Sequence, residues 1–281
     1  MGASIVDIAS RGRQSPIRLC VIDVDGTLLT SRHELTAATA AAVERASARG
    51  VQIVLATSRG PAALKPVLVQ LDRLRSEVFI ASQGALTARY GPSGVLNILA
   101  QHAIPIGAAH DVTCAAVEQG IAVNWYTSDG WYVSHVDHTV EREARVVGVS
   151  PVVRDLMSEC AGPDKLMLVS PSGDPAELGD LARGLPAGLR AQVSNPTYLE
   201  ITRADVDKAM AVAEYCRTIG IGASDVLAIG DGPNDLGVFA FAGVSVAPAN
   251  ARPEVLAAAD FITASNDEDG VALVLDAVSA Q

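Results

Sequence analysis

Val21-Ile22-Asp23-Val24-Asp25-Gly26-Thr27-Leu28-Leu29 is the stretch from which the fold of this chain is best inferred. It continues an apolar run that begins at Leu19 and ends in two aspartates one residue apart, followed by Gly-Thr. A short apolar run bounded by a turn predicts a buried strand. Open α/β sheets bind their ligands outside the carboxyl ends of the strands, so both carboxylates are candidates for an active site.

A second acidic cluster follows another apolar run much further along the chain. Asp231 and Asp235 come directly after residues 226–229, which predict a second strand, and they stand at the start of a predicted helix. Two acidic clusters at strand ends of one sheet can hold a hard divalent cation, since such ions prefer oxygen ligands. We therefore predict Mg²⁺ as the cofactor, bound by Asp23, Asp25, Asp231 and Asp235. The alternative for the second cluster is a pair of aspartates that cap and stabilise a helix start.

Length, composition and charge restrict the class of protein. The 281 residues are 49% hydrophobic and 19% charged, so a sizeable core is expected. The net charge of −11 argues against a nucleic-acid partner. No signal-peptide pattern or membrane-spanning stretch is present, so no membrane partner is expected. The four cysteines (Cys20, Cys114, Cys160 and Cys216) lie in or beside apolar segments and predict buried free thiols, which fits a cytoplasmic protein.

Strand and helix patterns alternate at both ends of the chain but not in its middle. Strands over 19–23, 51–56 and 78–81, separated by helices over 37–49 and 61–74, predict parallel strands with right-handed crossovers. Residues 86–195 combine hairpin patterns with helices instead. We therefore predict an α/β protein with a doubly wound, mostly parallel, Rossmann-like sheet and an inserted α+β domain. The predicted boundaries are 1–16 for a mobile N-terminal tail, 17–85 and 196–281 for the core, and 86–195 for the insertion.

The first acidic pair suits phosphoryl transfer. Asp23 can attack phosphorus as a nucleophile and form an aspartyl-phosphate. Asp25 can protonate the leaving oxygen and then deprotonate the attacking water. Magnesium would hold nucleophile and phosphate together despite their like charge. The alternative is that the two aspartates only cap a turn.

Two further segments suit a bound phosphate. Thr57 and Ser58 follow a predicted strand and precede a helix, where hydroxyls and backbone N–H groups can bind phosphate oxygens. An ordinary helix cap is the competing interpretation. Lys208 opens the predicted helix 207–218, where a cation opposes the helix dipole, so a role in balancing the nucleophile and the phosphate is indicated. A solvated surface lysine is its alternative.

These four segments, in this order, resemble the four motifs of the haloacid dehalogenase-like superfamily of phosphohydrolases. The position of the insertion is similar to that in the Cof-type branch, which carries an α/β cap domain. Residues 259–272 resemble a signature of that branch. The resemblance implies Asp23 as nucleophile, Asp25 as acid/base, Thr57 as the phosphate-binding hydroxyl, Lys208 as the third-motif lysine and Asp231 with Asp235 as metal-binding acids.

The resemblance also implies that Asn234 lies near the phosphate. Several positions depart from the branch pattern: Ser58 stands in place of glycine, Gln83 in place of asparagine, and Ala209 where glycine is common. These departures affect the expected choice of substrate rather than the expected activity.

For two other groups of residues we favour a structural role over a functional one. His135 and His138 could be a metal pair, but residues at a hairpin end explain them equally well. Four aromatic residues in a predicted hairpin are expected to pack in the core of the cap, with a partner subunit or the substrate entrance as alternatives: Trp125, Tyr126, Trp131 and Tyr132.

The resulting hypothesis is a magnesium-dependent phosphatase that acts on a small phosphorylated metabolite, such as a sugar or polyol phosphate. Asp23 and Asp25 would carry the chemistry while Thr57, Ser58, Lys208 and Asn234 bind the phosphate. A phosphomutase acting on a hexose phosphate is the first alternative, since relatives with a similar cap transfer phosphate between sugar hydroxyls. A non-catalytic sugar-phosphate binder is the second. Both a monomer and a homodimer are compatible with the sequence.

Overall fold

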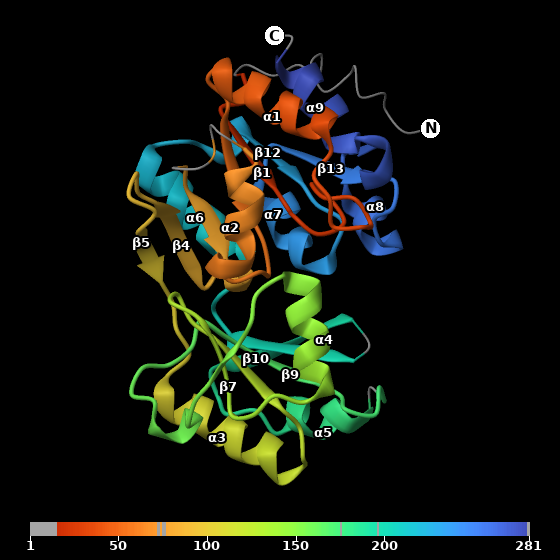
Figure 1. The fold of residues 1–281 in the computed structure, drawn as a ribbon. Coiled ribbons are helices and arrows are strands. Elements are labelled where there is room, and N and C mark those ends of the chain that lie inside the picture. The colour runs from red at the N-terminus through yellow and green to blue at the C-terminus, as the bar shows by residue number, and fades with distance from the viewer. Residues whose placement is uncertain (1–15, 72–73, 75–76, 175, 196, 280–281) are drawn as a thin grey trace.

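A computed structural model describes residues 16–71, 74, 77–174, 176–195 and 197–279 of the chain. Two α/β parts lie one above the other, with the described ends of the chain in the upper part (Figure 1). We refer to the upper part as the core and to the lower part as the cap. The predicted mobile tail over residues 1–16 lies outside the described residues, apart from the exposed Pro16.

The core contains an eight-stranded sheet in the order β14-β13-β12-β1-β2-β3-β4-β5. Pairing is parallel from β14 to β3 and antiparallel from β3 to β5. Its strands are β1 (Leu19–Ile22), β2 (Gln52–Ala56), β3 (Phe79–Ala81), β4 (Leu86–Tyr90), β5 (Leu96–Gln101), β12 (Val226–Ile229), β13 (Val244–Pro248) and β14 (Phe261–Thr263).

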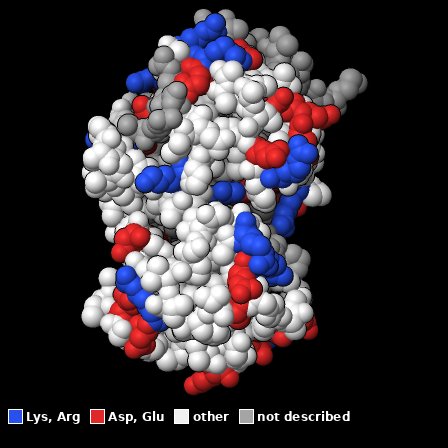
Figure 2. Space-filling model, in the orientation of Figure 1, with Lys and Arg blue, Asp and Glu red and all other residues white. Residues whose placement is uncertain are grey.

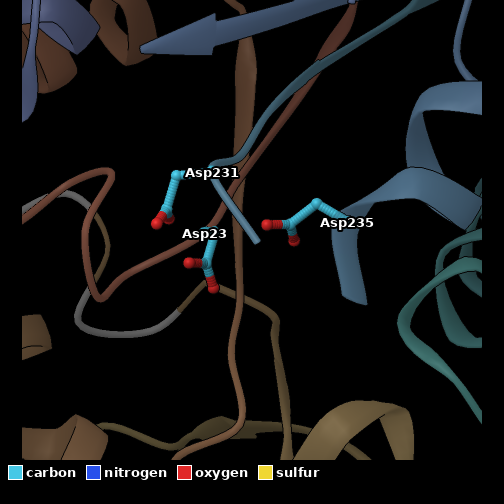
Figure 3. A group of neighbouring side chains, drawn as sticks. All are labelled: Asp23, Asp231 and Asp235. Carbon is cyan, nitrogen blue, oxygen red and sulfur yellow. The ribbon is translucent and has the colours of Figure 1, made fainter. Parts of the chain in front are cut away.

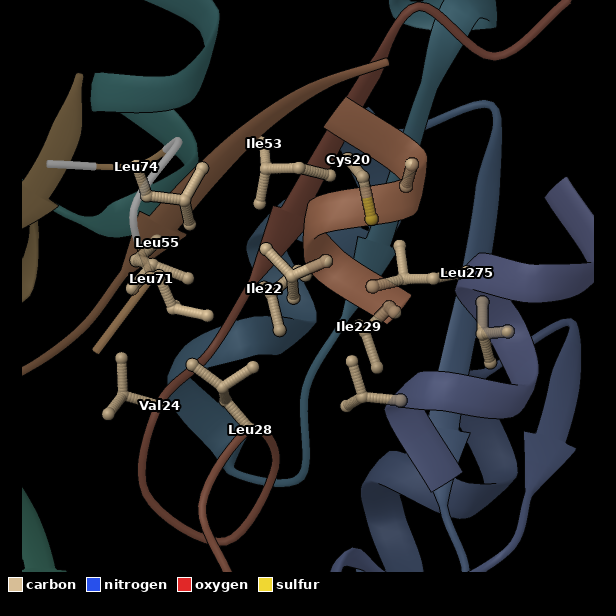
Figure 4. Close-up of a cluster of buried hydrophobic side chains, with 14 of the residues drawn as sticks. Cys20, Ile22, Val24, Leu28, Ile53, Leu55, Leu71, Leu74, Ile229 and Leu275 are labelled. Atoms are coloured by element: carbon tan, nitrogen blue, oxygen red, sulfur yellow. The ribbon is translucent and has the colours of Figure 1, made fainter. Parts of the chain in front are cut away.

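Helices cover both faces of the core sheet, which confirms the predicted doubly wound α/β class. One face is covered by α1 (Ala37–Ala48), α2 (Pro61–Val69) and α9 (Gly270–Ser279), and the other by α6 (Lys208–Ile219), α7 (Leu236–Phe241) and α8 (Pro253–Ala258). Residues of β1 alternate between the two clusters: Cys20 and Ile22 pack on the first face (Figure 4), Leu19 and Val21 on the second. A strand buried on both faces is therefore apolar throughout.

Strand β1 lies at the point where the chain order of the sheet reverses. The next strand, β2, pairs on one side of it, and the much later β12 pairs on the other. The crevice at such a reversal is where open α/β sheets bind ligands. Asp23 follows β1 directly and Asp231 follows β12 after one residue, so the topology alone brings the two acidic clusters to the same edge.

The cap is a six-stranded sheet in the order β10-β11-β9-β6-β7-β8. Helices α3 (Ile106–Glu118) and α5 (Ala176–Arg183) pack on the face away from the core, while α4 (His138–Val147) packs on the other face (Figure 1). The strands are β6 (Val123–Tyr126), β7 (Trp131–Val133), β8 (Val152–Val153), β9 (Lys165–Val169), β10 (Leu189–Asn195) and β11 (Tyr198–Arg203).

Sheet pairing corrects both predicted boundaries of the insertion. The hairpin over 86–100, assigned from sequence to the cap, pairs as β4 and β5 with β3 in the core sheet. The strand over 198–202, assigned to the core, is β11 of the cap. Only two residues separate β10 from β11, so the second strand turns back onto the first rather than crossing to another sheet. On pairing, the insertion therefore extends from about residue 102 to residue 203.

Smaller predictions about local structure have mixed outcomes. Thr36 accepts a hydrogen bond from the Thr39 N–H as the N-cap of α1, as predicted, and Pro61 is the first residue of α2. The prediction of four buried thiols is wrong for Cys114 and Cys160, which are exposed at the cap surface. Among the described residues, no helix is long and apolar enough to cross a membrane. The face seen in Figure 2 carries interleaved acidic and basic side chains.

Candidate active site

Asp23 and Lys208 form the centre of the site. Asp23 continues the pairing of β1 beyond its end, since its backbone N–H donates to the Ile229 carbonyl at 2.9 Å. The Lys208 ammonium donates to Asp23 Oδ1 at 2.6 Å and to Asp235 Oδ1 at 2.8 Å, and the lysine is only 1% exposed. Asp207 caps α6 by accepting from the Met210 N–H. The unfavourable position of a lysine at a helix start is therefore offset by two charge-assisted hydrogen bonds.

Three aspartates from the two predicted clusters converge beside this lysine. Single carboxylate oxygens of Asp23, Asp231 and Asp235 lie within 4.8 Å of one another, and Figure 3 shows the three side chains facing a common space. Thr27 donates to Asp231 Oδ1 at 2.8 Å, and the Gly232 N–H donates to Asp235 Oδ2 at 3.0 Å. The Asp231 side chain is therefore held by the loop after β1, and the Asp235 side chain by its own loop.

Two glycines make this convergence possible. Gly26 has φ of +79°, and a Cβ there would lie 2.4 Å from Asp231 Oδ2. A Cβ at Gly230 would lie 2.4 Å from Asp235 Cγ. A larger residue at either position would displace the acidic side chain, so the glycines next to the acidic residues belong to the architecture of the site.

The electrostatics of the cluster fit a divalent cation. Burial, with the neighbouring carboxylates adding to it, raises the pKa of Asp23 well above its ordinary value even though Lys208 opposes the shift. Burial also raises the pKa of Asp231, and the Asp23 and Asp235 carboxylates raise the pKa of Lys208. The Lys208 ammonium pairs with two of these three carboxylates and balances only one of the three negative charges present when all are ionised, so the cluster can accept a further counter-charge. A hard cation with oxygen ligands, such as Mg²⁺, would supply it.

Asp25 differs from the prediction in its surroundings. Its carboxylate is not part of the aspartate cluster but accepts two hydrogen bonds from Arg59, at 2.7 Å from Nε and 2.6 Å from Nη2. His33 Nδ1 lies 3.1 Å from Asp25 Oδ1. Burial alone would raise the pKa of Asp25, but the bonds and charge of Arg59, with His33, bring it below the ordinary value. The Asp25 side chain is thus paired with a guanidinium, where the sequence prediction made it a metal ligand.

Thr57 and Ser58 lie at the end of β2, as predicted. Thr57 is fully buried, and its hydroxyl accepts a hydrogen bond from the Arg59 N–H at 3.1 Å. Ser58 lines the same cavity as Asp23 and Asp231, described below. The structure brings both residues to the same edge as Asp23 because β2 pairs next to β1 in the same direction.

Asn234 and Gln83 connect the site to the cap. Asn234 lies in the loop after β12 and donates from Nδ2 to Gln83 Oε1 at 3.0 Å. Gln83 donates in turn from Nε2 to Glu200 Oε2, also at 3.0 Å. Glu200 belongs to β11 of the cap, so Gln83, which departs from the family pattern, bridges the two domains. Its backbone has φ of +61°, the left-handed region that non-glycine residues rarely adopt.

A cavity of about 290 Å³ lies between the core and the cap. Core residues including Asp23, Asp25, Ser58, Asn234 and Asp231 form one wall. Cap residues form the other, among them Tyr126, Glu143, Lys165, Met167, Gln192, Tyr198 and Glu200. A cavity with reactive carboxylates at one end and mixed polar and aromatic groups at the other suits a small polar molecule.

The predicted cap aromatics have divided roles. Trp125 and Tyr132 pack in one hydrophobic cluster of the cap, and Trp131 packs in a second, which agrees with the favoured interpretation. Tyr126 belongs to the second cluster and also lines the cavity. His135 lies between β7 and α4, while His138 is the first residue of α4, for which Asp137 is the N-cap, so only His135 lies near the end of the predicted hairpin.

Sequence reasoning missed several charged residues of the site, above all Arg59, Lys165 and Glu200. Arg59 follows Thr57-Ser58 directly, so its position at the end of β2 was a usable indication. The side chains of Glu200 and Lys165 are each 5% exposed; Glu200 stands between the apolar Leu199 and Ile201 of β11, and Lys165 opens the apolar strand β9. A charge inside an apolar strand pattern indicates a buried polar contact, because an unpaired buried charge is costly.

Comparison with known proteins agrees with this site. The family model described as haloacid dehalogenase-like hydrolase matches residues 20–275. YxeH of Bacillus subtilis, whose name describes an inferred phosphatase, is 30% identical over 269 residues, covering 91% of this chain and 96% of that protein. The 5-amino-6-(5-phospho-D-ribitylamino)uracil phosphatase YwtE of the same organism is 26% identical, covering 92% of this chain and 97% of its own.

A solved structure shows the same fold over nearly the whole chain. The crystal structure of a haloacid dehalogenase-like hydrolase from Bacteroides thetaiotaomicron has a TM-score of 0.83 and 26% identity, covering 92% of this chain and 98% of that one. The chain therefore belongs to the haloacid dehalogenase-like hydrolases. The family, the fold class and the assignment to the phosphoric monoester hydrolases, all predicted from the sequence, are confirmed.

Proposed function

We propose that the protein is a magnesium-dependent phosphatase that hydrolyses a small phosphorylated metabolite, such as a sugar or polyol phosphate, through an aspartyl-phosphate on Asp23. One observation carries the proposal. The Asp23 carboxylate lies at the floor of a 290 Å³ cavity, bonded to a buried lysine and within reach of two further aspartates. A protein that only binds sugar phosphates needs a cation beside the phosphate, not a buried carboxylate facing it.

The nucleophile is held ready by its neighbours. Lys208 fixes Asp23 Oδ1 and neutralises part of its charge, which lowers the repulsion felt by an approaching phosphate dianion. Asp23, Asp231 and Asp235 would hold Mg²⁺, which when bound offsets the negative charge that develops during phosphoryl transfer. Thr57, Ser58 and Asn234 are the groups that we assign to the phosphate oxygens.

Asp25 would move the proton. In this structure its carboxylate is paired with Arg59, which helps to hold the pKa of Asp25 below its ordinary value despite burial. A phosphate dianion beside Asp25 would add like charge and compete for the guanidinium, and both effects raise the pKa of the carboxyl. Asp25 could then donate a proton to the leaving oxygen and accept one from the water that hydrolyses the aspartyl-phosphate.

The cap wall of the cavity supports a hydroxylated leaving group. Glu143 and Glu200 offer carboxylates, while Gln192 and Tyr198 offer an amide and a phenol that can bond to hydroxyls. The Tyr198 hydroxyl already donates to Glu143 Oε2 at 2.9 Å. The relative YwtE is named for a substrate with a phosphorylated ribityl chain, which is a polyol phosphate. We assign the same broad class of substrate to this protein.

Release of inorganic phosphate tests the proposal. The purified protein is incubated with p-nitrophenyl phosphate and a panel of sugar and polyol phosphates, with Mg²⁺ and with EDTA. We expect magnesium-dependent release that is abolished in Asp23→Asn with the fold retained. Full activity of Asp23→Asn, or activity that EDTA leaves unchanged, would contradict the mechanism. Conversion of a hexose 1-phosphate into its isomer without release of phosphate would identify a phosphomutase instead.

A further inference from the structure

Among the described residues of the cap, Lys165 is the one that donates a hydrogen bond to the backbone of the loop after β2, to which we assign phosphate binding. It opens β9, the strand between β6 and β11 of the cap sheet. Its ammonium donates to the Ser58 carbonyl oxygen at 2.8 Å and to Glu200 Oε2 at 2.9 Å, and it lies 4.9 Å from the centre of the Tyr126 ring. One contact therefore reaches across to the core, while the other two hold the ammonium within the cap.

The bond to Ser58 acts on a peptide that also carries a contact to the catalytic site. In a planar trans peptide the carbonyl of Ser58 and the N–H of Arg59 point in opposite directions. The carbonyl is held by Lys165, and the N–H donates to Thr57 Oγ1 at 3.1 Å. Since that oxygen accepts a hydrogen bond, the hydroxyl can turn its own proton toward another acceptor. Within the described part of the chain the hydroxyl proton of Thr57 has no assigned acceptor, so it can be donated to a phosphate oxygen.

Glu200 extends the same connection to two other loops of the core. Its Oε2 accepts from Lys165 and from Gln83, and Gln83 Oε1 accepts from Asn234. The cap pair thus touches the loops after β2 and β3 directly and reaches the loop after β12 through one amide. Those loops carry Thr57, Ser58 and Asn234.

Cap stability by itself gives a poor account of this pair. A buried ion pair contributes little net stability compared with apolar residues of similar size, because both charges lose their hydration. The faces of β9 and β11 that carry Lys165 and Glu200 point toward the cavity, while Leu166, Leu199 and Ile201 pack into the apolar cluster on the other face. The charges are therefore placed where the cap meets the core.

We propose that Lys165 is a positioning residue for phosphoryl transfer. With the cap docked, its ammonium fixes the peptide between Ser58 and Arg59, and through that peptide it orients the Thr57 hydroxyl and the Arg59 guanidinium toward the phosphate. Glu200 holds the ammonium in place. This inference rests on the proposed phosphatase function. If Lys165 has this role, the arrangement of the phosphate-binding loop depends on the position of the cap.

Lys165→Met tests the inference against a matched control in the same domain. Arg154 also lies over an aromatic ring, 3.9 Å from the Tyr132 centroid, and pairs with a carboxylate, Glu159, at 3.3 Å, but it does not line the cavity. Both variants are compared with the unaltered protein in two assays. The first is magnesium-dependent hydrolysis of p-nitrophenyl phosphate, and the second is calorimetric binding of inorganic phosphate in the presence of Mg²⁺.

We expect Lys165→Met to lower kcat by about 10- to 100-fold, since misplacement of a reacting group by about 1 Å has effects of this size. Its affinity for inorganic phosphate should fall by about 10-fold. Arg154→Met should match the unaltered protein in both assays. Unchanged kcat and phosphate affinity in Lys165→Met would overturn the inference. A rise in KM alone would also overturn it, because that result indicates a direct contact with the leaving group.

Glu200→Gln covers the case in which Lys165→Met does not fold. The amide oxygen can still accept from Gln83, but the charge that holds Lys165 is gone, so a smaller loss of kcat and phosphate affinity is expected. Behaviour identical to the unaltered protein would overturn the inference. The phosphate-binding assay also separates the two proposals. An unaltered protein that binds phosphate but hydrolyses no ester would refute the proposed function, whereas phosphate affinity would still test Lys165.

Discussion

Asp164 should make the stability of the cap depend on pH. It precedes β9, is fully buried, and accepts a hydrogen bond from Gln101 at 2.8 Å on Oδ1, while its Oδ2 has no partner among the residues that the structure describes. Burial raises the pKa of this carboxyl to about 6 from its ordinary 3.8, with a smaller contribution from the charge of Asp129 and an opposing one from Gln101. The folded protein therefore retains the proton to a higher pH than the unfolded chain does.

The sign and size of the effect follow from this difference. Below about pH 3 the carboxyl is largely protonated in both states, and its contribution to stability is fully present. As the pH rises through 6 the folded protein must bury a charge, so about 3 kcal/mol of stability is lost by pH 8. Asp164→Asn carries no charge at any pH. Its free energy of unfolding, relative to the unaltered protein, should rise by about 2.5 kcal/mol between pH 4 and pH 8.

Urea unfolding followed by tryptophan fluorescence measures this difference. Both tryptophans of the chain, Trp125 and Trp131, lie in the cap, so the fluorescence reports on the domain that contains Asp164. Any constant cost of the new amide cancels when the pH dependence is compared. Asp137→Asn, in the same domain, is the control: although burial opposes the shift, hydrogen bonds from Thr139 and Val140 lower the pKa of Asp137, so its difference should change in the opposite direction. A pH-independent difference for Asp164→Asn would refute the reasoning.

Three further predictions concern the aspartate site. Lys208→Met should lower the free energy of unfolding, measured without metal, by about 3–5 kcal/mol, because it leaves buried carboxylates without their cation. Mg²⁺ should restore part of that loss in a thermal shift assay. Equal stability with and without the lysine would contradict the assigned contacts. Asp25→Asn should lower kcat for p-nitrophenyl phosphate by about 10²- to 10⁴-fold, and a KM effect alone would exclude the proton-transfer role. Gly26→Ala should weaken stabilisation by Mg²⁺, since its Cβ would displace Asp231; an unchanged Mg²⁺ titration would show that the loop adapts.

Local patterns were sufficient for the residues that directly follow strands. The apolar run before Asp23 and the one before Asp231 each predict a buried strand, and the carboxyl ends of neighbouring parallel strands meet at one edge. For these aspartates the relevant information lies within a few residues of the side chain. Lys208 needed more, because a lysine at a helix start, although it conflicts with the helix dipole, is locally explained as well by a solvated surface residue, and the order of the four motifs pointed to the site.

Domain membership was less accessible from the sequence. The pattern of β4 and β5 predicts a hairpin equally well in either sheet, and only the free edge of β3 places it in the core. Likewise the sequence predicts β11 as a strand, but the short link from β10 determines which strand it pairs with. An alternating or apolar pattern specifies that a strand forms and not which edge it joins.

The sequence by itself determined the family, the α/β class, and the acidic residues that meet beside Lys208, because these depend on strands and turns encoded locally. Only the tertiary structure decided that Asp25 pairs with Arg59 and that Lys165 and Glu200 of the cap reach Ser58 and Gln83 of the core. The Asp25–Arg59 pair joins two neighbouring loops of the core, whereas the contacts between cap and core join residues up to 117 positions apart and depend on how one domain docks on the other. The orientation of two separately folded sheets is set by surfaces that no single segment contains.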